Sequence, residues 1–244
     1  MRSSAAFAAL LRVALPLSAA AVAAAPATAA KPSRPAAVDP MDAGAWEIGP
    51  ILSGHNYSLN MPASPAPHAD GWSFDFPQPN KDAGHVHYVT FNHGSLKGKS
   101  AIVLRYRIEA EPGVQILPQE YPAAASTLTM YFQRRGDNWS GRGEYEHYRW
   151  WATFRVHMPL APGEHELTVR LDENWTSVMG SSAALNPRAF RTAIAEAERV
   201  GFTFGGGGAA GHGVYATGPA RFVLTGFEIR SDKTDFGIRT APGS

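Results

Sequence analysis

The stretch RVGFTFGGGGAAGHGVYATGPARFVLTGFEIR, residues 199–230, decides the fold of this chain. In its first part, VGFTF, apolar residues alternate with glycine and threonine, which is the two-residue period of a β-strand. Residues 222–229 form a second β-rich run that is apolar on both faces near its middle, as in a strand buried on both sides. Gly226 interrupts this run and predicts a bulge or a close backbone approach.

A glycine-rich segment joins the two predicted strands. Residues 205–208 are consecutive glycines, and His212 lies between two more. Glycine loses more backbone freedom on ordering than any other residue, so this run predicts a loop rather than regular structure. The segment lacks the Gly-Lys-Ser/Thr ending and the following helix of a phosphate-binding loop. The His212 ring could reach a ligand or hydrogen-bond the loop itself.

The rest of the chain reads as a ladder of short strands. Candidate strands cover residues 46–52, 72–76, 86–91, 101–109, 127–135, 149–158 and 164–171. The clearest of them alternate apolar and polar side chains, and turn signals such as Pro112-Gly113 separate them. Many short alternating strands predict an all-β fold, an antiparallel β-sandwich or jelly roll.

One short helix interrupts this pattern. Asn186 is a candidate N-cap, and Pro187 suits the first helical position. Phe190, Ile194 and Ala197 then recur at helical spacing. We expect this helix to close one end of the sandwich.

The N-terminal residues have the features of a secretory signal peptide. Arg2 and Arg12 lie near the start of an Ala/Leu/Val-rich run that ends in the small-residue site Ala27-Thr28-Ala29. The expected organisation is a signal peptide at 1–30, a Pro/Ala-rich linker at 31–45, a β-sandwich domain at 46–230 and a polar C-terminal tail at 231–244. The protein is therefore expected to be secreted or periplasmic. The alternative is an N-terminal anchor that is not cleaved.

Composition excludes several classes of protein. The chain has no cysteine, which excludes disulfides. Its formal charge is +1, and removal of Arg2 and Arg12 from the 22 basic residues leaves 20 against 21 acidic ones. A nucleic-acid partner is not expected, because such proteins usually carry a large basic excess. No later run is apolar enough to span a bilayer, so we expect no membrane insertion after signal cleavage.

Residues 164–230 resemble the galactose-binding-like jelly-roll superfamily, which includes many carbohydrate-binding modules. The resemblance lies in the order of strands and apolar anchors: a strand ending at Leu171, then Trp175, a helix with Phe190, and the last two strands. It implies sugar binding on a concave sheet face or at loop tips. A structural calcium ion is the cofactor that this resemblance implies, and the residues themselves indicate none.

Alternation also predicts a polar and aromatic sheet face. If the strands at 101–109, 127–135 and 149–158 are neighbours, their outward side chains form one surface that includes Arg105 and Arg107. Aromatic rings stack on sugar rings, and arginine forks match carboxylates. The predicted ligand-binding residues are Tyr131, Gln133, Arg135, Trp139, Tyr145, His147, Arg149, Trp151 and Arg155. Tyr145 and His147 are included because we extend the last strand backward from Arg149. The alternative is a solvated face whose arginines pair with Glu109, Glu164 and Glu166.

Two smaller features leave their role open. The loop at 136–148 exposes Trp139 either as a ligand lid or as a cap on the edge of the core. His85 and His87 would point to one face of a strand, where two imidazoles can hold zinc or copper. A third ligand is not evident from spacing, which favours hydrogen-bonded or surface histidines instead.

These patterns predict a secreted, non-catalytic β-sandwich that binds carbohydrate, a glycan or an acidic polysaccharide. One alternative is a polysaccharide lyase or hydrolase on the same face, with Arg149, His147 and Tyr145 serving β-elimination on a uronate. Another is a structural or protein-binding envelope protein. The chain has neither a Gly-x-Ser-x-Gly nor a His-Glu-x-x-His motif, so an enzyme is the less favoured interpretation.

Overall fold

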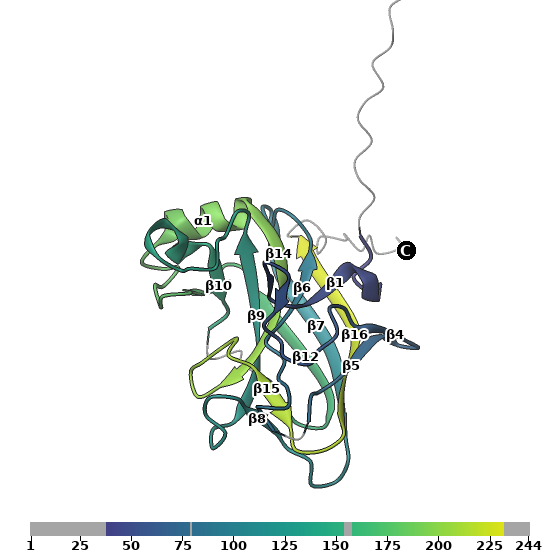
Figure 1. Ribbon diagram of the computed structural model, residues 1–244. Helices are drawn as coiled ribbons and strands as arrows, with labels where there is room; N and C mark the ends of the chain where they lie inside the picture. Colours follow the sequence, from purple (N-terminus) through teal and green to yellow (C-terminus); the bar gives the residue numbers. More distant parts are fainter. Residues whose placement is uncertain (1–37, 79, 154–157, 232–244) are drawn as a thin grey trace, which may run out of the picture. The chain divides into compact units, whose positions relative to one another are not determined.

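The computed structural model describes residues 38–78, 80–153 and 158–231, and two antiparallel sheets dominate them (Figure 1). The first sheet runs β1 (Trp46–Gly49), β6 (Tyr88–Asn92), β14 (Ala197–Gly206), β9 (Ser126–Arg134), β10 (Arg149–Trp151) and β13 (Thr176–Ser177), with β11 (Met158–Pro159) also paired to β9. The second runs β12 (Gly163–Arg170), β7 (Lys99–Ala110), β16 (Ala220–Ser231), β5 (Gly71–Asp75) and β4 (Ala66–His68). The predicted all-β sandwich is confirmed.

Two further strand pairs flank the sheets. β15 (Val214–Ala216) pairs with β8 (Ile116–Pro118), and β2 (Ile51–Leu52) pairs with β3 (His55–Asn56). Two short 3-10 helices, η1 (Ala43–Ala45) and η2 (Gly143–His147), complete the elements together with α1 (Pro187–Ala195). Within the described residues no helix is both long and apolar enough to cross a membrane.

The core lies between the sheets and is rich in aromatic rings. Phe202 of β14 and Phe222 of β16 stack across it with ring centroids 5.2 Å apart. Trp46 and Trp72 also meet across it, with ring centroids 4.9 Å apart and the rings tilted by 58°. All four side chains are buried. Burial of a large apolar side chain contributes roughly 1.5–3 kcal/mol to folding, so these contacts between sheets hold the sandwich together.

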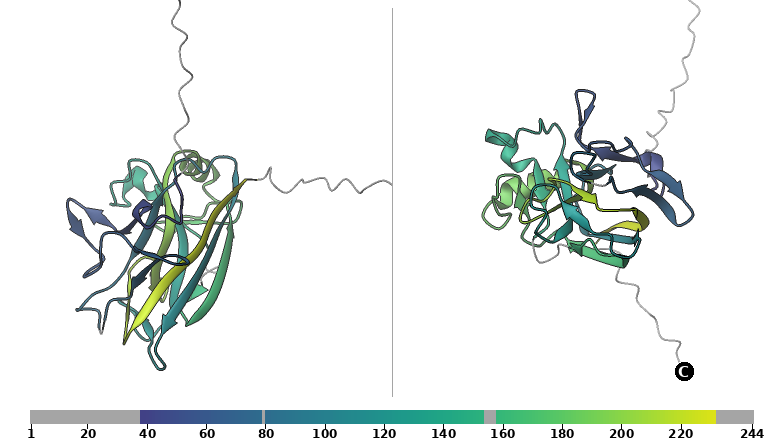
Figure 2. Two further views of the ribbon diagram at one scale, coloured as in Figure 1. Left: turned by 90° about the vertical axis from the view of Figure 1, so that its right-hand side faces the viewer. Right: turned by 60° about the horizontal axis from the view of Figure 1, so that its bottom comes forward.

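The two strands of the decisive stretch therefore belong to opposite sheets. Figure 2 (left) shows β16, the yellow strand, running beside β7, with β12 on the far side of β7. In the other sheet, β14 lies between β6 and β9. The predicted irregularity at Gly226 is confirmed, because the pairing of β16 with β7 shifts register between Leu224 and Gly226. Extra length in one strand of a pair bends it and re-aims its side chains.

The predicted helix forms α1 and packs against the end of the first sheet. Its Phe190 is buried and meets Trp150 of β10 edge to face, with ring centroids 5.0 Å apart. Asn186 occupies the N-cap position, but its side chain makes no capping bond; its Nδ2 donates to the carbonyl oxygen of Ser182. The helix is thus positioned mainly by the apolar contact of Phe190.

The fold begins before Trp46. Ala43 in η1 is buried in the core, within the part of the chain that was expected to be linker. The carbonyl oxygen of Pro40 accepts the indole N–H groups of Trp46 and Trp72, at 2.8 and 3.2 Å. These bonds satisfy two buried donors and tie the incoming chain to both sheets.

The expectation that the strand at 101–109 neighbours the one at 127–135 is wrong. β7 lies in the second sheet, paired with β12 and β16, so Arg105 and Arg107 lie on the opposite outer face of the sandwich from Arg149. Both strands alternate apolar and polar residues equally well, and alternation alone does not say which strands pair.

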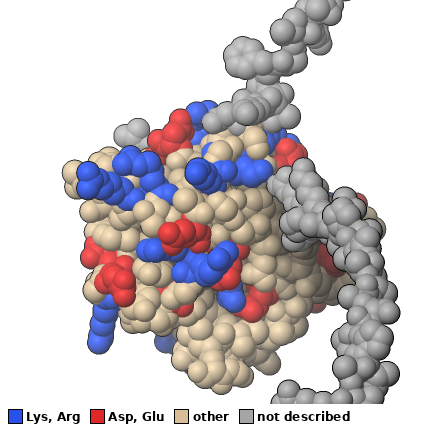
Figure 3. Space-filling model, turned by 90° about the horizontal axis from the view of Figure 1, so that it is seen from above, with Lys and Arg blue, Asp and Glu red and all other residues tan. Residues whose placement is uncertain are grey.

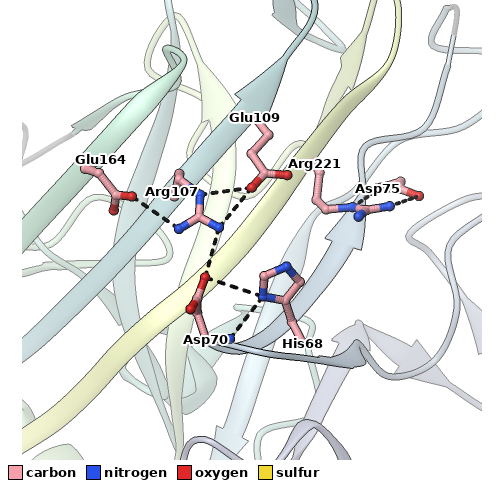
Figure 4. A network of polar contacts seen from close by, with 7 residues as sticks. All are labelled: His68, Asp70, Asp75, Arg107, Glu109, Glu164 and Arg221. Atoms are coloured by element: carbon pink, nitrogen blue, oxygen red, sulfur yellow. Dashed lines mark hydrogen bonds and ion pairs between the residues drawn. The ribbon is translucent and has the colours of Figure 1, made fainter.

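The charged side chains of the outer surface are largely matched with opposite charges. On the face seen from above in Figure 3, basic and acidic groups lie side by side. Arg107 contacts Asp70, Glu109 and Glu164, at 2.9 to 3.2 Å (Figure 4). Arg105 contacts Glu166 and Glu228, at 2.7 and 2.6 Å. The alternative of a solvated face with paired arginines is therefore confirmed for this sheet.

The predicted strand at 149–158 is interrupted. Trp151 of β10 pairs with Tyr131 of β9, and Met158 of β11 pairs with Leu128. Ala152 and Thr153 belong to no strand, so β10 ends at Trp151, and residues 154–157 lie outside the described residues. Arg155, one of the predicted ligand-binding residues, lies outside the described residues.

Candidate functional site

A cleft of about 720 Å³ opens on the outer face of the first sheet. β6 and β10 supply its floor, and the segments at 176–180 and 208–212 supply its walls. Gln119 and Glu120 close one side. Small-molecule sites in proteins fall in the range of roughly 300–1,000 Å³, so this hollow is large enough for a sugar or a ligand of similar size.

An aromatic cluster, separate from the main core, lies under this cleft. It consists of Tyr88, Tyr131 and Trp151, which are at most 8% exposed. Tyr131 and Trp151 are direct cross-strand partners with ring centroids 6.1 Å apart. The indole of Trp151 donates to Thr203 Oγ1 at 3.1 Å. Alternation predicted correctly that Tyr131 and Trp151 point away from the core; burial by neighbouring segments was not predicted.

A buried ion pair holds the loop at 136–148 against this cluster. Arg149 Nε lies 2.7 Å from Asp137 Oδ2, although its N–H is not aligned for a hydrogen bond. Arg149 Nη2 donates to the carbonyl oxygen of Trp139 at 2.8 Å, and the guanidinium carbon lies 4.7 Å from the centre of the Trp139 ring. Gln133 donates to the same carboxylate at 2.9 Å. Asp137 has no exposed side-chain surface, so these contacts must offset the cost of removing both charges from water.

The same loop explains why two predicted residues are misplaced. Tyr145 and His147 lie in η2 and do not continue β10 backward, which makes the predicted strand extension wrong. Gly141 lies before this helix and Gly143 is its first residue; their φ values of +63° and +59° suit glycine and are incompatible with an extended strand. His147 stacks on Trp150 at 5.7 Å instead of joining Arg149 in the cleft.

The glycine-rich segment packs onto the aromatic floor from above. Gly211 has φ +83°, and a Cβ at this position would lie 2.8 Å from the Tyr88 hydroxyl oxygen. At Gly213, with φ +90°, a Cβ would lie 2.8 Å from His87 Nε2. Any side chain at these positions would collide with the floor, so glycine permits the backbone to form the wall of the cleft.

Pairing of β8 with β15 brings the two sides of the cleft together. Pro118 is the register partner of Val214, and the amide of Gln119 donates to the carbonyl oxygen of Gly213 at 3.0 Å. Glu120 consequently meets His212, with Oε1 2.8 Å from Nδ1. Both side chains are about half exposed at the rim. Sequence analysis singled out His212 but could not have supplied its partner, which is distant in the chain.

Burial changes the acid–base behaviour of the floor. It raises the pKa of Tyr88 to about 12, against the opposing effect of Arg149, so the phenol keeps its proton. It lowers the pKa of His87 to about 4, and the nearby His85 adds to this effect. His87 Nε2 and Gln119 Oε1 are buried without a well-aligned hydrogen bond. His87 is therefore a neutral side chain at ordinary pH.

The structure brings together some predicted ligand-binding residues and separates others. Arg149 and Trp151 line the cleft, and Tyr131, Gln133 and Trp139 support it from below or behind. Arg135 is 73% exposed and pairs loosely with Glu198 at 3.8 Å. The lining residues that sequence analysis did not place there include His87, Tyr88, Gln119, Glu120 and His212, together with residues 176–180 and 208–211.

No group of three or more metal-ligating side chains occurs in the described parts of the chain. His85 and His87 do share a location, with ring centroids 4.7 Å apart. No known protein family matches this chain, and no curated protein is significantly similar to it. The likeness to the galactose-binding-like superfamily therefore stays a prediction, and the function has to be argued from the cleft itself.

Proposed function

We propose that this protein is a secreted, non-catalytic carbohydrate-binding β-sandwich whose ligand site is the cleft over β6 and β10. The observation that carries the proposal is the combination of an aromatic floor with polar walls in one hollow of about 720 Å³. Sugars present apolar ring faces and many hydroxyl groups. A site with aromatic edges, fixed polar groups and backbone amides matches both parts of such a ligand.

The rim supports this proposal because it offers accessible side chains of two kinds. Glu120 and His212 provide polar contacts on one wall. Met179, which is 64% exposed, provides an apolar contact on the other. The glycine-rich wall adds backbone close to the floor without side chains that would fill the cleft.

The arrangement of side chains on which the lyase alternative was based does not form. It required Tyr145, His147 and Arg149 on one strand face, whereas the first two lie in η2. Arg149 itself contacts Asp137 and Trp139. Tyr88, His87 and Arg149 do line the cleft together, but Arg149 is already engaged by Asp137, and a pKa of about 4 makes His87 a weak base. We therefore favour binding without chemistry.

A glycan array tests the proposal. The mature chain should retain at least one glycan class, and His212→Ala should reduce that retention. His55→Ala is the matched control, because His55 is an exposed histidine of β3 outside the cleft and should be without effect. Absence of retained glycans would contradict the proposal. Capture of a protein partner together with absence of glycan retention would favour an envelope protein that binds protein.

A further inference from the structure

The cleft cannot present a free arginine fork to an acidic sugar. Arg149 is the lining arginine, and its guanidinium already contacts the Asp137 carboxylate, the Trp139 carbonyl oxygen and the Tyr88 hydroxyl. Removal of one partner from a buried ion pair leaves the other charge uncompensated, which is strongly unfavourable. A uronate carboxylate would have to compete with Asp137 for this group.

The remaining charges in the cleft do not make it positive. Among the described lining residues, the ionisable groups besides Tyr88 and Arg149 are Glu120 and the histidines His87 and His212. Asp137 cancels Arg149, and buried His87 is neutral at ordinary pH. Glu120 is left with His212, which offsets its charge only when the imidazole is protonated. A polyuronate carries a negative charge on each sugar and would gain no electrostatic attraction from this balance.

The Glu120–His212 pair has the chemistry to hold hydroxyl groups. An ionised carboxylate only accepts hydrogen bonds, so His212 Nδ1 carries a proton and donates it to Glu120 Oε1. In the neutral ring, Nε2 is then an acceptor. The second carboxylate oxygen of Glu120 is another. Two acceptors at one rim suit two neighbouring hydroxyls, which have protons to donate, whereas an ionised carboxylate has none.

We propose that the cleft is specific for a neutral sugar, and that Glu120 and His212 bind two neighbouring hydroxyl groups of it. This inference rests on the proposed function and makes it narrower. It replaces the acidic polysaccharide expected from sequence, whose basis was a set of free arginines. Of the other arginines of that set, Arg105 and Arg107 are paired with carboxylates on the opposite sheet, and Arg135 lies 3.8 Å from Glu198. Arg155 lies outside the described residues.

The experiment compares matched neutral and acidic probes. Polygalacturonate and its fully methyl-esterified form share one backbone and differ in charge, and a glycan array extends the comparison to other neutral and uronate polymers. The wild-type chain should retain neutral members, and its retention should change little with salt, because exposed ion pairs are screened whereas hydroxyl contacts are not. Retention of uronate polymers alone, weakened by salt, would overturn the inference while the proposed function survives.

A single substitution should change the affinities for neutral sugars and for uronates in opposite directions. Glu120→Gln removes one negative charge and replaces an acceptor oxygen with a donor. Affinity for a neutral sugar should fall roughly tenfold, as for loss of a hydrogen bond to a charged group. Affinity for a uronate should instead rise, because repulsion is removed. Glu164→Gln in the other sheet is the control and should leave retention unchanged.

The outcomes distinguish a failure of the neutral-sugar inference from a failure of carbohydrate binding itself. A neutral ligand whose binding is weakened by Glu120→Gln supports the inference. A ligand whose binding is strengthened or unaffected by this substitution overturns it and leaves carbohydrate binding intact. No retention of any glycan by the folded wild-type chain overturns both. Thermal unfolding of each variant confirms that it is folded before its binding is compared.

Discussion

Gly211 lies directly against Tyr88, close enough that a Cβ at position 211 would be 2.8 Å from the phenol oxygen. The contact joins a glycine-rich loop to the floor of the cleft. It requires both the absence of a side chain and a φ of +83°, which glycine adopts at low cost. Gly211 is therefore a means of laying backbone onto an aromatic surface. The expectation that all of residues 205–208 form a loop is wrong, because Gly205 and Gly206 belong to β14.

We expect Gly211→Ala to destabilise the protein by about 2–4 kcal/mol, because it adds a collision to the strain of a left-handed conformation, which alone costs roughly 1–2 kcal/mol. Gly113→Ala is the matched control. Gly113 has φ +85°, and an added Cβ there would meet nothing within 4 Å. Chemical denaturation of both variants measures the difference, and equal losses would show that the contact with Tyr88 is unimportant.

Stability should depend on pH through His87. Its folded-state pKa is about 4, below the ordinary value of 6.5, mainly because of burial. Between these values the unfolded chain binds a proton that the folded chain does not, so stability rises with pH. The full contribution is present above about pH 6.5 and is lost as pH falls toward 4, by up to about 3 kcal/mol.

Urea unfolding of the wild type and of His87→Gln between pH 4 and pH 7 tests this dependence. The variant should show a flatter profile in that window, since glutamine does not titrate. His55→Gln changes an exposed histidine of β3 and should keep the slope of the wild type. A slope that survives in His87→Gln would place the proton uptake elsewhere.

The separation of the two outer faces leads to a prediction about binding. Arg107 lies on the second sheet and contacts Asp70, Glu109 and Glu164, away from the cleft (Figure 4). Arg107→Gln should therefore leave glycan retention unchanged, whereas His212→Ala should reduce it. A loss of glycan retention in Arg107→Gln would mean that the ligand binds the outer face of the second sheet instead of the cleft.

The alternation of apolar and polar side chains predicted which way each side chain points, but it did not predict which strands pair with one another. Met130 and Phe132 face the core and Tyr131 faces away, as the two-residue period requires. The same two-residue period in β7 did not indicate which sheet β7 belongs to, because strand pairing is decided by contacts between residues that are far apart in the chain. The prediction that Arg105 joins Tyr131 failed for this reason.

The candidate site was harder to predict because loops supply much of it. Glu120 and His212 are brought together by the pairing of β8 with β15, two strands of three residues each. Such short strands give almost no periodic signal. A signal was present at Gly141 and Gly143, which mark the end of the extended chain before η2 and could have prevented the backward extension of β10.

The buried pair of Arg149 and Asp137 should contribute strongly to the integrity of the cleft. Asp137→Asn leaves the guanidinium buried without a counter-charge, and we expect a loss of about 3–5 kcal/mol in the free energy of unfolding. The double variant Asp137→Asn, Arg149→Met should be more stable than the sum of the single effects indicates, since both charges are gone. Asp172→Asn is the control: its pair with Arg170 is exposed on both sides, at 66% and 58%, and its loss should cost less than about 1 kcal/mol. Equal effects of Asp137→Asn and Asp172→Asn in urea unfolding would contradict the structural role of the buried pair.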